Sequence, residues 1–317
     1  MASGPSYMLL CTLMLMIVRE GVATSQFLND FGLCIVDKGF TASASGLIFT
    51  TDPVVERGSA ASFNKPQNRI KINDDGTYLF IIHRAGMIAR NSQGSRPEPF
   101  LLEISNTPDV EIVDTGEESI CTVHVLAELK RDNIVSISIP ASLNTVPADE
   151  NRPFIFSAFL LYHTPIVSFP RARQSAFSVN LNGVVLSVAD SIIKTFAPPT
   201  VNIGDEFDRM TGVYTAPFEG LYVFHLAVTF SSESGGTGRA AVAFQTNGNT
   251  KAQVSDQVQS IPQTPAFRVV YTYYVPPQNS AITVAQNLNQ GDKITLRNVI
   301  AESGVRGSGT FVGYLLS

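Results

Sequence analysis

The sequence predicts an all-β protein built from two tandem β-sandwiches or barrels. Three observations lead to this prediction: many short segments alternate apolar and polar residues with a period of two, turn residues separate these segments, and the chain shows neither an amphipathic helix nor a heptad repeat. With 317 residues, the chain is long enough for two domains that each bury a core. Its 44% apolar and 15% charged residues are typical of a globular protein.

The N-terminal residues predict secretion. An apolar run at residues 7–18 (YMLLCTLMLMIV) is too short to span a bilayer comfortably, and small residues follow it, so cleavage after Ala23 or Ser25 would remove a signal peptide at residues 1–25. Because residues 1–7 contain no Lys or Arg, a buried apolar segment or a signal anchor stays as the alternative. No later run is long and apolar enough for a membrane span, and we expect a secreted, extracellular protein.

The second half of the chain shows the strand pattern most clearly. At residues 221–230, Tyr222, Phe224 and Leu226 alternate with Val223 and His225, so both faces of this strand are largely apolar. Further strands are predicted at 239–250, which runs into an Asn-Gly turn, and at 267–275, 280–288, 293–301 and 310–317.

The turn before residue 221 contains Pro217 and Gly220. Proline fixes φ and cannot donate to a sheet, so Pro217 marks the end of the preceding strand. We expect Gly220 to adopt a turn conformation that other residues resist.

The first half repeats landmarks of the second in the same order. Thirteen residues separate Phe63 from Gly76 and likewise Phe207 from Gly220, and each glycine is followed by x-Tyr-x-Phe. Residues 156–162 (FSAFLLY) close the first half as residues 311–317 (FVGYLLS) close the second. An internal duplication is therefore predicted, with domains at 26–165 and 174–317 and a linker at 166–173; coincidental similarity of β patterns is the alternative.

Residues 174–317 resemble the globular head domain of complement C1q, within the tumour-necrosis-factor-like family. The motifs that carry the resemblance are AFSV (176–179), VNIGDEFDRMTGVYTAPFEGLYVF (201–224), QTNG, LNQGDKITL and the terminal GTFVGYLL. Residues 27–165 resemble the family weakly, as a divergent second copy without the Thr-Gly-x-Tyr-Thr-Ala-Pro motif. The resemblance implies two ten-stranded jelly-roll sandwiches and a homotrimer, in which the second apolar face of residues 221–230 packs against a neighbouring protomer.

Motifs for catalysis, metals and nucleic acid are absent from the sequence. The four histidines show no metal-ligand spacing, and we interpret His124 and His225 as structural residues of strands. No nucleophile motif is present, so no enzyme is predicted. The net charge of −5 without a basic stripe argues against nucleic acid, and the lack of a Gly-x-y repeat excludes a collagen stalk.

The candidate ligand-binding residues lie in three polar segments predicted as loops, at 230–239, 253–265 and 301–309: Ser234, Thr237, Arg239, Gln257 and Arg306. Tolerated variable loops are the alternative. The resemblance also implies a calcium site at Asp256, although the companion Asp of the family is replaced here by VPPQNSA and one carboxylate is far short of six to eight oxygen ligands. No other cofactor is expected.

Two cysteines remain after the predicted cleavage. Cys34 and Cys121 form a disulfide in one interpretation and are buried thiols in the other, because the sequence does not fix the distance between their Cα atoms.

The function implied by the resemblance is lectin-like extracellular recognition of glycans or microbial surfaces in innate immunity. A structural component of the extracellular matrix and a cytokine-like ligand of a cell-surface receptor are the alternatives.

Overall fold

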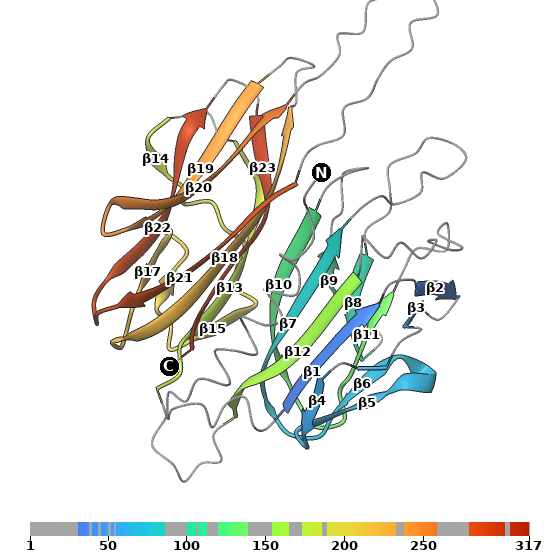
Figure 1. The fold of residues 1–317 in the computed structure, drawn as a ribbon. Coiled ribbons are helices and arrows are strands. Elements are labelled where there is room, and N and C mark those ends of the chain that lie inside the picture. The colour runs from blue at the N-terminus through green and yellow to red at the C-terminus, as the bar shows by residue number, and fades with distance from the viewer. Residues whose placement is uncertain are drawn as a thin grey trace, which may run out of the picture.

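The computed structural model describes most of the chain between residues 31 and 316 (Figure 1). It does not describe the stretches 38–39, 44–45, 50–51, 54, 86–99, 106, 113–119, 139–153, 165–172, 186–188, 233–237, 259–278 and 302–304. The predicted signal peptide, most of the predicted linker and the predicted strand at 267–275 therefore lie outside the described residues.

The first sandwich, residues 31–163, consists of two five-stranded antiparallel sheets. One sheet has the order β10 (Ile120–Leu129), β7 (Gly76–Ala85), β12 (Phe154–His163), β1 (Phe31–Asp37) and β4 (Val55–Gly58). The other has the order β5 (Ala61–Asn64), β6 (Arg69–Ile72), β11 (Ile134–Ser138), β8 (Phe100–Ile104) and β9 (Thr107–Ile112). A separate hairpin joins β2 (Phe40–Ser43) to β3 (Gly46–Phe49), and a single 3₁₀ turn spans Lys65–Gln67.

The second sandwich, residues 176–315, is built in the same way. Its first sheet has the order β15 (Val201–Ile203), β13 (Ala176–Val185), β23 (Val305–Leu315), β18 (Gly220–Ser232) and β21 (Asn279–Leu288). Its second sheet has the order β16 (Phe207–Asp208), β17 (Val213–Thr215), β22 (Lys293–Ala301), β19 (Gly238–Thr246) and β20 (Asn249–Val258), and the short β14 (Ser191–Ile192) also pairs with β22. The predicted fold class, two tandem jelly-roll sandwiches, is confirmed.

The two sandwiches have the same strand order. Without β2, β3 and β14, the strands of the first sandwich correspond one to one, in chain order, to those of the second: β1 to β13, β4 to β15, and so on to β12 and β23. Each pair of corresponding strands also takes the same place in its sheet. That this common order arose by duplication of one domain stays a prediction.

Equivalent connections contain equivalent hydrogen bonds. In the first sandwich, the amide of Asp132 donates to the carbonyl of Ile72, and the hydroxyl of Tyr78 donates to the carbonyl of Asp74. In the second sandwich, the amide of Gly291 donates to the carbonyl of Ala216, and the hydroxyl of Tyr222 donates to the carbonyl of Phe218. All four distances are 2.8–2.9 Å. The two sandwiches therefore share the details of their turns as well as their strand order.

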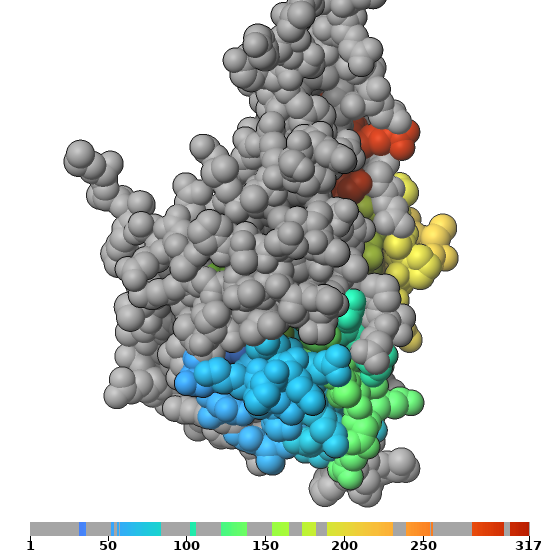
Figure 2. Space-filling view, turned by 90° about the vertical axis from the view of Figure 1, so that its right-hand side faces the viewer, coloured from blue at the N-terminus to red at the C-terminus, as the bar shows by residue number. Residues whose placement is uncertain are grey.

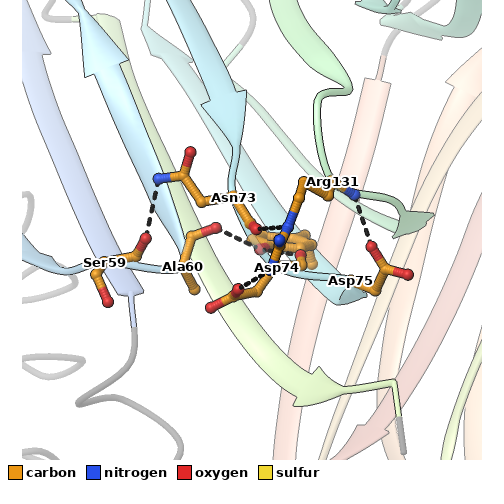
Figure 3. A network of polar contacts seen from close by, with 7 residues as sticks. Ser59, Ala60, Asn73, Asp74, Asp75 and Arg131 are labelled. Carbon is orange, nitrogen blue, oxygen red and sulfur yellow. Dashed lines mark hydrogen bonds and ion pairs between the residues drawn. The ribbon is translucent and has the colours of Figure 1, made fainter. Parts of the chain in front are cut away.

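An arginine holds one of these connections together in the first sandwich (Figure 3). The backbone amide of Arg131 donates to Asp75 Oδ1 at 2.7 Å, and its guanidinium donates to the Asn73 carbonyl at 2.7 Å and to Asp74 Oδ1 at 3.3 Å. Asn73 in turn donates its side-chain amide to the carbonyl of Ser59 at 2.9 Å. These contacts fix the turn between β6 and β7 against the turn between β10 and β11.

The predicted Asn-Gly turn joins β19 to β20. Asn247 and Gly248 both have positive φ, 50° and 79°, which is the backbone conformation of a two-residue type I′ hairpin. Asparagine and glycine adopt this conformation at lower cost than other residues, so the sequence specifies the hairpin directly.

Gly220 does not have the turn conformation expected from the sequence. Neither Gly220 nor its counterpart Gly76 has positive φ, and each is the first residue of its strand. At Gly76 a Cβ atom would collide with the carbonyl oxygen of Tyr162 on β12. Close approach of two strands therefore accounts for the glycine at position 76, in place of a left-handed backbone.

A third apolar core lies between the two sandwiches, in addition to the core inside each. It is formed by the outer faces of the β10–β4 sheet and the β15–β21 sheet, and its buried residues are Leu79, Ile81, Leu126, Leu161, Tyr162, Ala176, Val201, Val223, Val312 and Tyr314. Strand β10 contacts each of the five strands of the β15–β21 sheet. In Figure 2, yellow atoms of the second sandwich lie above green atoms of the first at the right of the view.

This packing corrects the expectation for the second apolar face of residues 221–230. Val223 and His225 on that face pack against the first sandwich of the same chain, where the resemblance had placed another protomer. Tyr162 also forms hydrogen bonds across the boundary. Its hydroxyl lies 2.6 Å from the carbonyl oxygen of Leu315 and 3.0 Å from that of Ser175.

Candidate functional site

Strands β18, β19, β20, β22 and β23 of the second sandwich each begin or end at one end of the sandwich, which we call the loop end. Ser232 at the end of β18 pairs with Val305 at the start of β23, Gly238 at the start of β19 pairs with Val258 at the end of β20, and Ala301 at the end of β22 pairs with Ala240. The three predicted ligand-binding segments therefore come together in space, although they are far apart in the sequence. Ser234 and Thr237 lie outside the described residues.

Arg239 and Gln257 are neighbours at the loop end. They are register partners on β19 and β20, and Arg239 is exposed. Arg306 lies at the same end on the other sheet, opposite Ser231 of β18, and is partly buried. The structure thus brings Arg239 and Gln257 side by side and places Arg306 across the sandwich from them.

Parts of the predicted loops are strands. Residues 253–258 belong to β20, an edge strand with exposed polar residues such as Gln253 and Ser255, and this polarity had indicated a loop. Residues 305–309 belong to β23, where a Cβ atom on Gly309 would collide with the backbone of Ala227. Glycine in this segment therefore reflects close contact between β23 and β18, and the loop predicted here from its glycines is wrong for residues 305–309.

Asp256 is also a strand residue. It lies on β20 opposite Ala240, a residue with no side-chain oxygen. Within the described part of the chain, no three His, Cys, Asp or Glu side chains come together as metal ligands. The side chain of Asp256 lies outside the described ones, so the calcium site at this residue stays a prediction.

Ile300 is a residue of the loop end that no sequence motif indicates. Its side chain is 38% exposed, although Ile294 and Leu296 on the same strand are fully buried. The pairing of β19 with β22 shifts between Ala241 and Val242, so that Val299 is passed over and the alternation of β22 changes. A regular period of two would have placed Ile300 in the core, which is why the sequence pattern gave no signal for it.

The disulfide interpretation is inconsistent with the sheet. Cys34 lies on β1 and Cys121 on β10, and the strands β12 and β7 separate them. Neighbouring strands are about 4.8 Å apart, so three steps place the two Cα atoms roughly 14 Å apart or more, beyond the reach of a disulfide. Cys34 is buried.

The family model of the C1q domain matches residues 176–316, which include every strand of the second sandwich. No curated protein matches the chain. In the described residues we find no helix with the length and apolar character needed to cross a membrane.

Three solved structures are similar to the chain. The globular domain of zebrafish complement 1qA protein is 19% identical, covers 45% of this chain and 98% of its own, and has a TM-score of 0.32. Murine APRIL at pH 5.0 is 16% identical, with 46% and 100% covered and a TM-score of 0.30. The Eiger TNF structure from S. frugiperda is 16% identical, with 45% and 93% covered and a TM-score of 0.29.

Proposed function

Because residues 176–316 match the family model of the C1q domain, we propose that the chain is a secreted, non-enzymatic recognition protein that binds glycans or microbial surfaces through the loop end of the second sandwich. The observation that supports this proposal is the gathering of strand ends there, with the exposed cation Arg239 on β19 two residues before Ala241, the register partner of the exposed apolar residue Ile300 on β22. A guanidinium can donate hydrogen bonds to sugar hydroxyls, and an apolar side chain can pack against the apolar face of a sugar ring.

The test is a binding assay of the mature chain, from Gln26, against a glycan panel and whole microbial cells. We expect binding that free sugar competes away and that Arg239→Ala weakens about tenfold, the loss of one charge-assisted hydrogen bond of about 1.5 kcal/mol. Arg209→Ala is the matched control, because Arg209 is an exposed arginine that lies away from the loop end. It follows β16, and Val213 of the neighbouring β17 pairs with Thr295 of β22, six residues before Ala301 at the loop end.

Two outcomes would contradict the proposal. If folded protein binds neither glycans nor cells, a matrix or receptor-ligand function replaces it. If Arg239→Ala and Arg209→Ala weaken binding equally, the loop end is not the binding site. A chelator arm tests the calcium expectation: loss of binding on chelation would support a calcium site at Asp256, and binding that survives chelation would remove it.

The homotrimer implied by the resemblance stays a prediction, and its value for recognition would be avidity from three copies of a weak site. The part of the outer face of the β15–β21 sheet around Val201, Val223 and Tyr314 packs against the first sandwich, so contacts between chains have to use exposed residues elsewhere on this face or another surface. Sedimentation velocity over a range of concentrations measures the mass directly. A mass of one chain throughout would remove avidity from the proposal.

A further inference from the structure

Three of the four histidines lie at the boundary between the two sandwiches. His83 is on β7, His124 on β10 and His225 on β18, and their side chains are 8%, 2% and 0% exposed. The rings of His124 and His225 stack across the boundary, with centroids 4.0 Å apart and planes 8° from parallel. The fourth, His163, is exposed at the end of β12.

Hydrogen bonds hold His225 as a neutral ring. Its Nε2 lies 2.9 Å from the carbonyl oxygen of Thr122 in the first sandwich, which only accepts, so we assign the ring hydrogen to Nε2. Its Nδ1 lies 2.9 Å from Thr283 Oγ1 and then accepts a hydrogen bond from that hydroxyl. The neutral ring therefore satisfies both nitrogens and joins the two sandwiches.

His124 has fewer polar contacts. Its Nδ1 is buried without a hydrogen-bond partner, and the nearby ring of Tyr314 lies 6.4 Å away between centroids. A second proton on this ring would make it an imidazolium and would place a positive charge in an apolar layer, in direct contact with a second imidazole. Burial accordingly holds the pKa of His124 well below its usual range, and the proximity of His225 lowers it further. Burial also lowers the pKa of His225, to about 4, and that of His83.

No described neighbour offers a compensating negative charge. Among the strands packed around the pair, β13, β15, β18 and β21 have no charged residues apart from His225 itself. Besides His124 itself, the titratable or charged groups on the remaining strands are Tyr78, His83 and Arg84 on β7, Cys121 and Glu128 on β10, and Arg306 and Tyr314 on β23. Glu128 is exposed and lies four residues along β10 from His124.

We propose that the stacked pair His124–His225 makes the contact between the two sandwiches sensitive to acid, so that protonation separates the sandwiches while each keeps its fold. The separated form exposes both rings to water, where an imidazole binds a proton near pH 6.5. In the closed form both rings stay neutral. The closed form therefore has its full stability relative to the separated form above pH 6.5, and it loses this stability as the pH falls below 6.5. Because two rings take up a proton on separation, the equilibrium constant between the separated and the closed form rises by up to about 100-fold for each pH unit of acidification between about pH 6 and pH 4.

Small-angle X-ray scattering on the full chain tests the proposal. Between pH 7.5 and 4.5 we expect the radius of gyration to rise reversibly, while far-UV circular dichroism stays constant because the sheets persist. The double variant His124→Phe/His225→Phe keeps a stacked aromatic pair without a titrating group and should remain compact at pH 4.5. His163→Phe, at the exposed histidine, should behave like the wild type.

An unchanged radius of gyration in the wild type down to pH 4.5 would overturn the proposal, and so would separation of the double variant at the same pH as the wild type. If the double variant fails to fold, NMR of ¹⁵N-labelled histidine in the wild type gives an independent decision. We expect the rings of His124 and His225 to change protonation together with the rise in radius. Titration of either boundary ring near pH 6.5 without a change in radius would also contradict the proposal.

Discussion

Gly313 shows how closely the aromatic core of the second sandwich is packed. It lies on β23, where a Cβ atom would collide with the ring of Phe177 and lie 2.7 Å from Phe224 Cδ1. Both rings are fully buried, with Phe177 0% exposed and Phe224 1% exposed. Since neighbouring rings in a packed core cannot move without creating strain elsewhere, this position tolerates no side chain.

Gly313→Ala should therefore lower the free energy of unfolding of the second sandwich by about 1–3 kcal/mol through overpacking. Gly32→Ala is the matched control, because a Cβ atom there meets Phe159 at an ordinary 3.6 Å. We expect the control to change stability by less than about 0.5 kcal/mol. Urea denaturation of both variants makes the comparison, and equal losses would contradict this account of Gly313.

Corresponding turns of the two sandwiches differ in one charge. The connection from β21 to β22 contains Asp292, which accepts hydrogen bonds from the Asn247 side chain and from the Asn289 amide, each at 2.8 Å. The corresponding residue of the first sandwich is Asn133, which accepts from the Lys130 amide at 2.7 Å and donates to Ser105 at 2.9 Å. The same turn is thus held by a carboxylate in one sandwich and by an amide in the other.

This difference predicts a pH dependence for the second sandwich. The hydrogen bonds from Asn247 and Asn289 lower the pKa of Asp292 below 3.8, so the folded state binds fewer protons than the unfolded state just below that pH. The contribution of the carboxylate to stability is present above pH 3.8 and is lost as the pH falls through the folded pKa. Asp292→Asn should reduce the stability difference between pH 6 and pH 3 in urea denaturation, and Asn133→Asp should add such a difference to the first sandwich. An unchanged difference in both variants would count against this role.

The sequence predicted the strands well where one face of a strand alternates regularly. The hairpin at Asn247 and Gly248 was predicted because its residues have few other conformations at low cost. The predictions failed where a contact distant in sequence decides the outcome. Gly309 is a strand residue because β18 approaches it, and Ile300 is exposed because the pairing with β19 shifts. Of the candidate ligand-binding residues, Arg239 and Gln257 were predicted in loops and lie on paired strands.

The two sandwiches share a core to which each contributes residues. Leu126 of β10 is 2% exposed and belongs to this shared core. The sequence indicated an apolar second face on residues 221–230 and could not say what covers it, because periodicity reports burial and not the identity of the neighbour. The structure shows the first sandwich in that place.

We expect wild-type protein to unfold in a single calorimetric transition at neutral pH, because the shared core couples the sandwiches. Leu126→Ala removes buried contacts worth about 2–5 kcal/mol and should split this transition in two. Leu102→Ala, a fully buried residue of the core of the first sandwich, should lower the transition temperature without splitting it. If Leu126→Ala unfolds in a single transition at the wild-type temperature, the boundary does not couple the unfolding of the two sandwiches.

The joining of both sandwiches in one polypeptide has a consequence for dilution. Two separate chains that meet through such a face lose translational and rotational freedom on association, and their complex dissociates when its concentration falls below its Kd. Here the linked partner is present at an effective concentration on the order of millimolar, whatever the amount of protein in solution. The contact through Val223, Tyr314 and Leu126 therefore persists however far the protein is diluted.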